Sequence, residues 1–478
     1  MKKANKSVSG ANNGIKPTAN VEMCLLPDDK CNYLVVDFSD HYVSFVEKAQ
    51  WHIFSKDGRT AKSVIDSRLV KHILRETKIY IIAGIPYIYE NGYYRIDSRQ
   101  TRLKAIITQH LIEELINIST INKIYNLFLS LDSIQRDFEE INNMDARIIN
   151  FKNGLFDPLN WKMKEHTPDY FSINQIPWNF NPNAIPKGKI TKNFMEFAIP
   201  DPADRKMFWQ YAGYCLTPDT RFQKFMILKG QGGTGKSKLL HIIEMMVGKE
   251  NTSSISLQQL NERFHPSMLL GKLLNSCADI PTKAMDAVDG IKKATGEDFM
   301  FAEKKGKDGF SFRSYAKLIF SANEIPINIE EKSEALYRRM LIIKVERKPE
   351  KINLNLGEQL DAEIDYSLME ACKALHRLYI ASEFVESKNS KDNVKEVYME
   401  ADTVTAFLSE KTKRDNGKSI KAPELYDEYK KYCEFTDRKA FGRSVFHKAM
   451  KNKRYSKKRI STGEIYEGIT LKDEMMNL

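Results

Sequence analysis

The sequence predicts an α/β protein in which a central parallel-sheet domain follows an α+β domain and precedes a compact basic module. Between residues 201 and 350, apolar strand candidates alternate with helical stretches, which is typical of an α/β domain. A glycine-rich stretch in this region, KFMILKGQGGTGKSKLL (residues 224–240), lies between two apolar runs. The excess of basic residues lies near the C-terminus, in a segment with its own helix and strand patterns.

The 478 residues are enough for two to four domains. Residues 1–20 are polar and predict a disordered tail, and residues 21–145 form an N-terminal domain. In that domain Asn91 and Gly92 separate two aromatic strands, which predicts a hairpin. The other expected segments are a connector rich in Pro, Asn and Gly at 146–200, the α/β domain at 201–350, an amphipathic helical linker at 351–400 and the basic module at 401–478.

The composition argues against a membrane protein and against a secreted one. No apolar run approaches the roughly 20 residues needed to cross a bilayer, and the lysines near the N-terminus precede no apolar segment. The six cysteines are scattered, without C-x-x-C pairs or histidines at zinc spacing. We therefore expect reduced thiols in a cytoplasmic protein with no membrane partner.

The glycine-rich stretch has the spacing of a phosphate-binding loop. Residues 230–237 read G-x-x-x-x-G-K-S, between an apolar strand candidate and an apolar helix candidate. Glycines permit positive φ and close backbone approach, so that successive N–H groups converge on an anion at a helix N-terminus. Lys236 would reach the β- and γ-phosphates, and the Ser237 hydroxyl would complete the coordination of Mg²⁺. We therefore expect a nucleoside triphosphate with Mg²⁺, bound by Gly230, Gly232, Gly233, Thr234, Gly235, Lys236 and Ser237.

Two later strand candidates end in polar residues. KLLNSCADIP places Asp279 at the end of one strand, and YAKLIFSANEIP places Asn323 at the end of another. An open α/β sheet presents such strand ends to its ligand. Asp279 would orient the metal ion, with a solvated turn aspartate as the alternative, and the Asn323 amide would hold an attacking water. Arg338 and Arg339 precede the next apolar strand, MLIIKV.

The order of loop, acid, asparagine and arginine pair is that of an AAA+ ATPase. The segments GQGGTGKS, ADIP, KKATGEDFMFAEKKGKDGFSFRSYAKLIFSANEIP and ALYRRM together resemble the superfamily 3 helicases. Within these the chain looks most like the helicase portion of phage, plasmid, poxvirus and pathogenicity-island primase–helicases and replication initiators. In length and layout it is similar to initiators of the staphylococcal pathogenicity-island type. The resemblance spans residues 64–471 and is strongest over 225–343.

The resemblance implies an AAA+ P-loop ATPase core, with ATP and Mg²⁺ as cofactors and residues 146–200 as a connector or helical collar. Lys236 and Ser237 fall on its phosphate and magnesium positions, Asp279 on the metal-orienting acid and Asn323 on the polar sensor. Arg338 falls on the arginine finger, which would complete the site of the neighbouring subunit. One arginine of the Arg338–Arg339 pair would instead brace the fold.

Lys305 and Lys307 lie on the turn of AEKKGKDGF, which in this family is a hairpin that holds DNA in the channel of a hexamer. In isolation the same turn is a solvated charge run. Two residues depart from the family pattern. Thr234 stands where many members have asparagine, and Ile280 replaces a second acid, which leaves the general base unassigned.

The basic module resembles a winged-helix domain. Between residues 411 and 460 there are 17 Lys and Arg against 6 Asp and Glu, a local excess equal to the formal net charge of +11. We expect a helix at 419–433, a second helix at 441–451 and a two-stranded wing at 455–470, an arrangement that docks on duplex DNA. A protein–protein module is the alternative. The expected DNA contacts are Arg443, Lys448, Lys451, Lys457, Lys458 and Arg459.

These expectations describe an ATP-dependent DNA helicase and replication initiator of a mobile genetic element. It would be a homohexameric ring that binds origin duplex, translocates 3′ to 5′ on single-stranded DNA and works in the cytoplasm of a bacterial host, with a separate primase or other replication proteins as candidate partners. One alternative is a bifunctional primase–helicase, whose metal ions need carboxylates such as Asp37 and Asp40. Another is an origin-binding protein that uses ATP only as an assembly switch.

Overall fold

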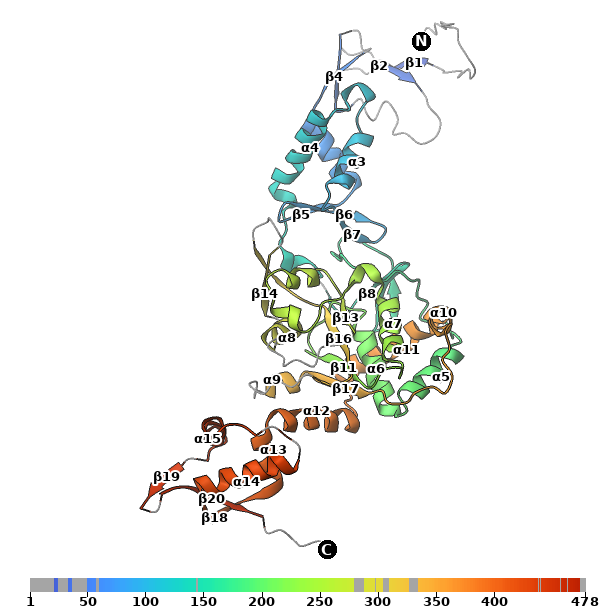
Figure 1. Cartoon of the computed structure of the whole chain (residues 1–478). Coiled ribbons are helices and arrows are strands. Elements are labelled where there is room, and N and C mark those ends of the chain that lie inside the picture. Colours follow the sequence, from blue (N-terminus) through green and yellow to red (C-terminus); the bar gives the residue numbers. More distant parts are fainter. Residues whose placement is uncertain are drawn as a thin grey trace. The chain divides into compact units, whose positions relative to one another are not determined.

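The computed structural model describes residues 21–24, 33–36, 50–56, 60–142, 145–278, 288–296, 298–303, 309–325, 334–436, 438, 440–455, 457–461 and 463–472 (Figure 1). The expected tail at 1–20 lies outside these residues. The chain divides into two compact units. Unit 1 comprises Met1–Glu90 and Tyr94–Phe138, and unit 2 comprises Asn91–Tyr93 and Glu139–Leu478.

Unit 1 combines helices with short antiparallel strands. Strand β1 pairs with β2, β3 pairs with β4, and β5, β6 and β7 form a three-stranded sheet. The hairpin predicted at Asn91 and Gly92 is confirmed, and both residues have positive φ (53° and 91°), as a tight two-residue turn requires. The elements are β1 Val21–Cys24, β2 Tyr33–Val36, β3 His52–Phe54, β4 Ala61–Val64, α2 Asp66–Glu76, β5 Ile79–Ile82, β6 Ile85–Glu90, β7 Tyr93–Ile96, α3 Thr101–Gln109 and α4 Ile118–Ser130.

The core of unit 1 is built from the apolar faces of its helices. Leu69 and Ile73 of α2, separated by one helical turn, pack with Leu103 of α3 and Phe128 of α4, and all four are fully buried. Residues one turn apart lie on the same face of a helix, so each helix presents one apolar stripe to the sheet and to its neighbours.

Unit 2 begins with the segment expected to be a connector, which has structure of its own. Strands β8 (Ile149–Phe151), β9 (Gly154–Asp157) and β10 (Lys162–Lys164) form an antiparallel sheet, and α5 (Lys189–Ala198) follows. Helix α6 (Pro202–Tyr214) starts at the N-cap Asp201, whose side chain accepts from the N–H groups of Ala203 and Asp204.

A five-stranded parallel sheet forms the centre of unit 2, which confirms the predicted α/β core. Its strands lie in the order β12-β13-β16-β11-β17, and every neighbouring pair is parallel. Helix α7 (Lys236–Val247) follows β11 directly. The strands are β11 Phe225–Lys229, β12 Thr252–Ser253, β13 Leu274–Cys277, β16 Lys317–Ala322 and β17 Met340–Lys344.

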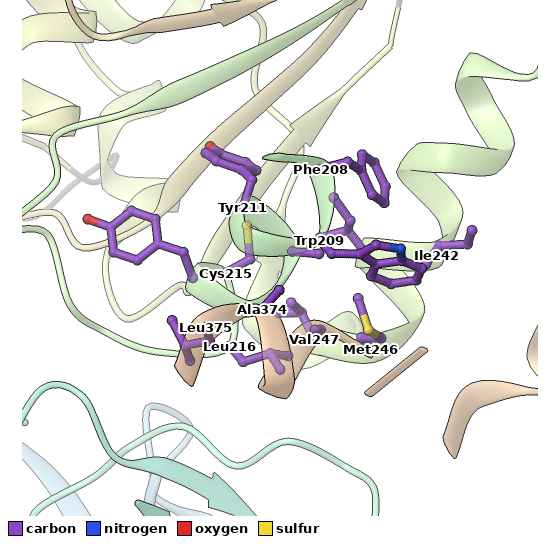
Figure 2. Packing of buried hydrophobic residues seen from close by; sticks show 14 of the residues in the cluster. Phe208, Trp209, Tyr211, Cys215, Leu216, Ile242, Met246, Val247, Ala374 and Leu375 are labelled. Atoms are coloured by element: carbon purple, nitrogen blue, oxygen red, sulfur yellow. The ribbon is translucent and has the colours of Figure 1, made fainter. Parts of the chain in front are cut away.

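Both faces of this sheet are covered, as is usual for a parallel sheet. In β11, Met226 and Leu228 belong to one hydrophobic core, whereas Phe225 and Ile227 belong to another, because successive side chains of a strand point to opposite faces. The first core contains residues of α6, α7 and α11 (Ile364–Ala381). Figure 2 shows part of it, with Phe208 and Tyr211 of α6, Ile242 and Met246 of α7, and Ala374 and Leu375 of α11.

The expected helical linker follows the last strand of the sheet, β17. The helices expected between 351 and 400 are present as α10, α11 and most of α12, and α12 packs against β17. The remaining elements are α8 Val288–Thr295, β14 Phe299–Ala302, β15 Phe310–Arg313, α9 Glu334–Tyr337, α10 Leu356–Asp361 and α12 Lys388–Ala401.

The C-terminal module contains helices and an antiparallel sheet of order β18-β20-β19. The helix expected at 419–433 begins at Ala422 instead, because Ser419–Lys421 pair with β20. The second helix and the two strands expected after it are present, and β18 pairs with β20 as a third strand of the same sheet. The elements are α13 Thr403–Lys411, β18 Thr412–Lys421, α14 Ala422–Phe435, α15 Arg443–Asn452, β19 Lys457–Ile460 and β20 Gly463–Leu471.

From the sequence we expect neither a membrane-spanning helix nor disulfide-bonded cysteines. Over the described residues, each helix is too short or too polar to cross a membrane. Cys215, Cys372 and Cys433 are buried free thiols, and Cys277 is a half-buried one.

Lys317, the first residue of β16, is buried beside the sheet with 3% of its surface exposed. Its Nζ donates to the main-chain oxygens of Thr217, Tyr315 (2.8 Å) and Asp219 (3.1 Å). Burial lowers the pKa of Lys317 from 10.5 to about 8, and the nearby Cys215 and Asp219 oppose this shift.

Lys317 should make unfolding depend on pH. Between about pH 8 and 10.5 the unfolded chain binds the Lys317 proton and the folded chain does not, so the free energy of unfolding should rise with pH, by up to about 1.4 kcal/mol per unit. Urea titrations of the wild type and Lys317→Met should show a stability difference that grows in favour of the wild type from about pH 7 to pH 9.5. The exposed Lys293→Met is the control. A pH-independent difference for Lys317→Met would contradict the assignment.

Candidate functional site

The glycine-rich loop joins the end of β11 to the start of α7. Gly235 is the N-cap of α7 with φ of 100°, and Gly233 has φ of 81°, values that favour glycine. A Cβ on Gly230 would lie 2.0 Å from the main-chain oxygen of Val345, so the loop lies directly against the residue after β17. These constraints explain why Gly230, Gly233 and Gly235 are glycines. The N–H groups in the first turn of α7, which have no partner within the helix, lie next to this loop.

Lys236 and Asn323 come together at the start of α7. The Lys236 ammonium is buried and donates to the main-chain oxygens of Gly230 and Gln231 (2.9 Å) and to Asn323 Oδ1 (3.2 Å). Asn323 follows the last residue of β16, which pairs with β11 in parallel register. The carboxyl ends of two neighbouring strands therefore bring these side chains together.

The other loop residues have different environments. Thr234 is buried, and its Oγ1 donates to the main-chain oxygen of Gln231 at 2.9 Å. Ser237 is exposed in the first turn of α7. A Cβ on Gly232 would meet no atom within 4 Å, and its φ does not favour glycine, so the structure gives no reason for a glycine at this position. The Ser237 hydroxyl thus lies at the helix N-terminus where a magnesium ligand is predicted.

Asp279 lies outside the described residues, as do Asp37 and Asp40. The strand that leads to Asp279, β13, ends at Cys277 and pairs with β16 in the same parallel sheet. This strand therefore ends at the same edge of the sheet as β11 and β16, the edge on which the loop and Asn323 lie.

Arg338 and Arg339 lie between α9 and β17 in opposite environments. Arg339 is 8% exposed, and its guanidinium donates to the main-chain oxygen of Ala335 (2.7 Å) and to Gln223 Oε1 (2.9 Å). Burial, and secondarily the charge of Arg338, lowers the pKa of Arg339. The Arg338 residue is exposed, although its main-chain oxygen accepts from Lys224 Nζ at 2.6 Å. Arg339 therefore braces the fold of its own chain, and Arg338 is the exposed member of the pair.

The two lysines expected to hold a DNA strand, Lys305 and Lys307, also lie outside the described residues. The strands on either side, β14 and β15, pair antiparallel from Phe299 with Arg313 to Ala302 with Phe310. The residues before and after this segment are therefore paired with each other in one two-stranded sheet.

The basic residues of the C-terminal module fall into two groups. Arg443, Lys448 and Lys451 are exposed on α15, as predicted. In the wing, Lys457 and Lys458 form ion pairs with carboxylates of β20, Glu464 (2.7 Å) and Glu467 (2.9 Å), while Arg459 is exposed. The sequence pattern did not indicate these two ion pairs. Because they neutralise Lys457 and Lys458, the exposed basic residues of α15 form the more strongly positive surface.

Two glutamines at the site were not predicted. The main-chain oxygen of Gln231 accepts from both Lys236 and Thr234, and the Gln223 side chain holds Arg339. Gln231 occupies a variable position of the loop pattern and bonds through its main-chain oxygen, so its residue type could not have predicted these contacts. Gln223 has φ of 51°, which marks the turn before β11, but its partner lies 116 residues away.

Two family models match the chain. The model described as "D5 N terminal like" matches residues 38–213, and DUF5906, a family of unknown function, matches residues 228–339. The second match contains the whole loop, residues 230–237, together with Asn323 and Arg338.

The chain also resembles curated proteins. It is 23% identical over 282 residues to "Putative helicase L207/L206" of Acanthamoeba polyphaga mimivirus, a stretch that covers 53% of this chain and 28% of that protein. It is 28% identical over 126 residues to "Uncharacterized mitochondrial protein ymf21" of Marchantia polymorpha, covering 24% of this chain and 70% of that protein. The match thus spans less than a third of the length of the mimivirus protein.

Among solved structures, the chain is similar to the A form apo structure of the NrS-1 C terminal region, with 14% identity and a TM-score of 0.48 over 84% of this chain and 99% of that one. A second apo structure of the same region gives 13% identity and a TM-score of 0.46, over 85% and 99% of the two chains. Over 53% of its length the chain is thus similar to a protein described as a putative helicase.

Proposed function

We propose that the chain is an ATP-dependent DNA helicase of replication initiation, in which a homohexameric ring hydrolyses ATP between subunits. The observation that carries this proposal is the meeting of the Lys236 ammonium and Asn323 Oδ1 at 3.2 Å. A loop lysine binds phosphate, and a neighbouring amide orients a water for attack, so the pair has the two functions that cleavage of a γ-phosphate needs. ATP and Mg²⁺ are the proposed cofactors, with Ser237 and Asp279 on the metal.

Assembly follows from the arginine pair. Arg339 is held within its own subunit, whereas Arg338 is exposed and lies at the end of a short helix. An arginine finger acts from a neighbouring subunit and contributes on the order of 10³ to 10⁵ in rate. Arg338 is therefore the proposed finger, and hydrolysis would require a ring or at least a pair of subunits.

Two DNA contacts are proposed. Exposed basic residues on α15 would bind duplex DNA at the origin, where each Lys or Arg that neutralises a phosphate adds to the salt dependence of binding. Lys305 and Lys307 would hold the single strand on the turn between β14 and β15. The proposed 3′ to 5′ direction and a separate primase as partner rest on the family resemblance alone.

Lys236→Ala tests the nucleotide site. Hydrolysis of ATP should fall on the order of 10² to 10³-fold, because a positioned donor on developing phosphate charge is lost. DNA unwinding should stop, while duplex binding and the circular dichroism spectrum should stay as in the wild type. Lys249→Ala, an exposed lysine just beyond α7, is the control and should keep full activity. Near-normal hydrolysis in Lys236→Ala would remove the assignment of the loop.

The two arginines should fail in different ways. Arg338→Ala should bind nucleotide and keep its thermal unfolding midpoint, but hydrolyse ATP poorly. Arg339→Ala should lower the midpoint, because Ala335 and Gln223 lose a buried charged donor. Mixing Arg338→Ala with Lys236→Ala should restore part of the hydrolysis, since a mixed interface can combine an intact loop with an intact finger. A mixture no more active than its components would speak against action between subunits.

The surface of α15 should dominate duplex binding. In Lys448→Ala with Lys451→Ala, the slope of log affinity against log salt should become shallower by as much as about 1.8, since each lost phosphate contact removes about 0.9. The control is Lys430→Ala with Lys431→Ala on α14, where both lysines already pair with Asp427 (2.9 Å) and Glu428 (2.8 Å). Fluorescence anisotropy across a salt series measures both slopes. Equal slopes for the two variants would show that the basic module is only a solvated surface.

A further inference from the structure

Two histidines and a glutamate converge in unit 1, outside the region proposed to bind nucleotide. His72 and Glu76 lie one turn apart on α2, and His110 caps the C-terminal end of α3. Glu76 Oε1 lies 3.0 Å from His72 Nε2, and Glu76 Oε2 lies 3.1 Å from His110 Nε2. The three ligand atoms all lie within 4.8 Å of one another.

The hydrogen bonds of His110 aim a lone pair into this cluster. His110 Nδ1 lies 2.8 Å from the main-chain oxygen of Ile106, which can only accept, so Nδ1 carries the hydrogen. In the neutral ring, Nε2 then presents its lone pair to a carboxylate oxygen at 3.1 Å. Two acceptors at this distance repel each other unless a cation lies between them. A histidine held through Nδ1 by a main-chain oxygen is also the usual orientation of a metal ligand.

The cluster is rigid on one side and open on the other. Trp51 is 1% exposed, its ring centroid lies 4.3 Å from that of His72, and its Nε1 donates to the main-chain oxygen of His110 at 3.0 Å. The Glu76 side chain is 49% exposed, whereas that of His110 is 8% exposed. The two imidazoles are therefore held in place against a buried tryptophan, and solvent reaches the cluster from the side of Glu76.

We propose that His72, Glu76 and His110 bind one Zn²⁺ ion. Two imidazoles and one carboxylate are a ligand set that Zn²⁺ takes in tetrahedral sites, with water in the fourth position. Ligand atoms about 2.0–2.2 Å from the metal lie roughly 3.3 Å apart in a tetrahedron, so three atoms that already lie within 4.8 Å of one another need only a small side-chain movement to bind one ion. Mg²⁺ prefers oxygen ligands and is disfavoured here. The ion would tie α2 to the end of α3, 34 residues later in the chain.

The test is a calorimetric titration of Zn²⁺ into the untagged full chain without nucleotide. The wild type should bind an ion that raises the thermal unfolding midpoint. Glu76→Gln and His72→Gln should each weaken this binding at least tenfold, since even changes behind the ligands cost on the order of 10- to 100-fold in affinity. Glu113→Gln, an exposed carboxylate elsewhere in unit 1, should bind as the wild type does.

Substitution with Co²⁺ separates this site from the cysteines. The ligand-field spectrum should appear without a thiolate charge-transfer band and should be lost in both variants, each of which keeps a wild-type circular dichroism spectrum. Equal Zn²⁺ affinity in Glu76→Gln, in His72→Gln and in the wild type would overturn the proposal. So would a wild type that binds no ion, which would make the cluster an imidazolium–carboxylate hydrogen-bond network.

Discussion

The parallel pairing of β11 with β16 and β17 holds the loop on which the rest of the site depends. The Gly230 N–H donates to the main-chain oxygen of Ala322 at 3.0 Å, and the Val345 N–H donates to that of Lys229 at 2.7 Å. The loop thus begins between two neighbouring strands. Because β16 runs directly into Asn323 and β17 starts directly after Arg339, the pairing that fixes the loop also fixes the residues that flank it.

The strands at the centre of this sheet are buried on both faces. Polar side chains on these strands therefore need hydrogen-bond partners within the protein. Asn275 of β13 is fully buried. Its side chain accepts from the N–H of Ile255 (2.9 Å) and donates to the main-chain oxygen of Ile255 (2.9 Å). Lys317 of β16 is satisfied by three main-chain oxygens. Beside the sheet, a Cβ on Gly213 would lie 2.3 Å from the main-chain oxygen of Ala371, so α6 and α11 approach closely. Apolar strands and close-packed helices therefore set the sheet edge that carries the loop.

The features that the sequence predicted well are those set by local rules. The loop spacing, the Asn91–Gly92 hairpin and the alternation around β11 each depend on a few adjacent residues. The features that it missed join distant parts of the chain: Gln223 holds Arg339, Glu464 holds Lys457, and Ser419 pairs with Glu467 in a third strand of the wing. In each case one residue gives no signal, because a glutamate or glutamine outside the core is compatible with many folds. Helix propensity around 419–421 was overridden by pairing with β20.

The position of Lys236 also connects nucleotide binding to the neighbouring subunit in the proposed mechanism. Its ammonium donates to two main-chain oxygens and to Asn323, all neutral acceptors, and an anionic phosphate oxygen is a stronger acceptor than any of them. Transfer of Lys236 to phosphate would therefore free the Asn323 amide to bind water. Asn323 directly follows β16, and Arg338 lies two residues before β17, the strand on the other side of β11. A change at the loop thus lies next to both the proposed water-binding residue and the strand that follows the proposed finger, so the sheet would provide a short path from nucleotide occupancy to the proposed subunit interface.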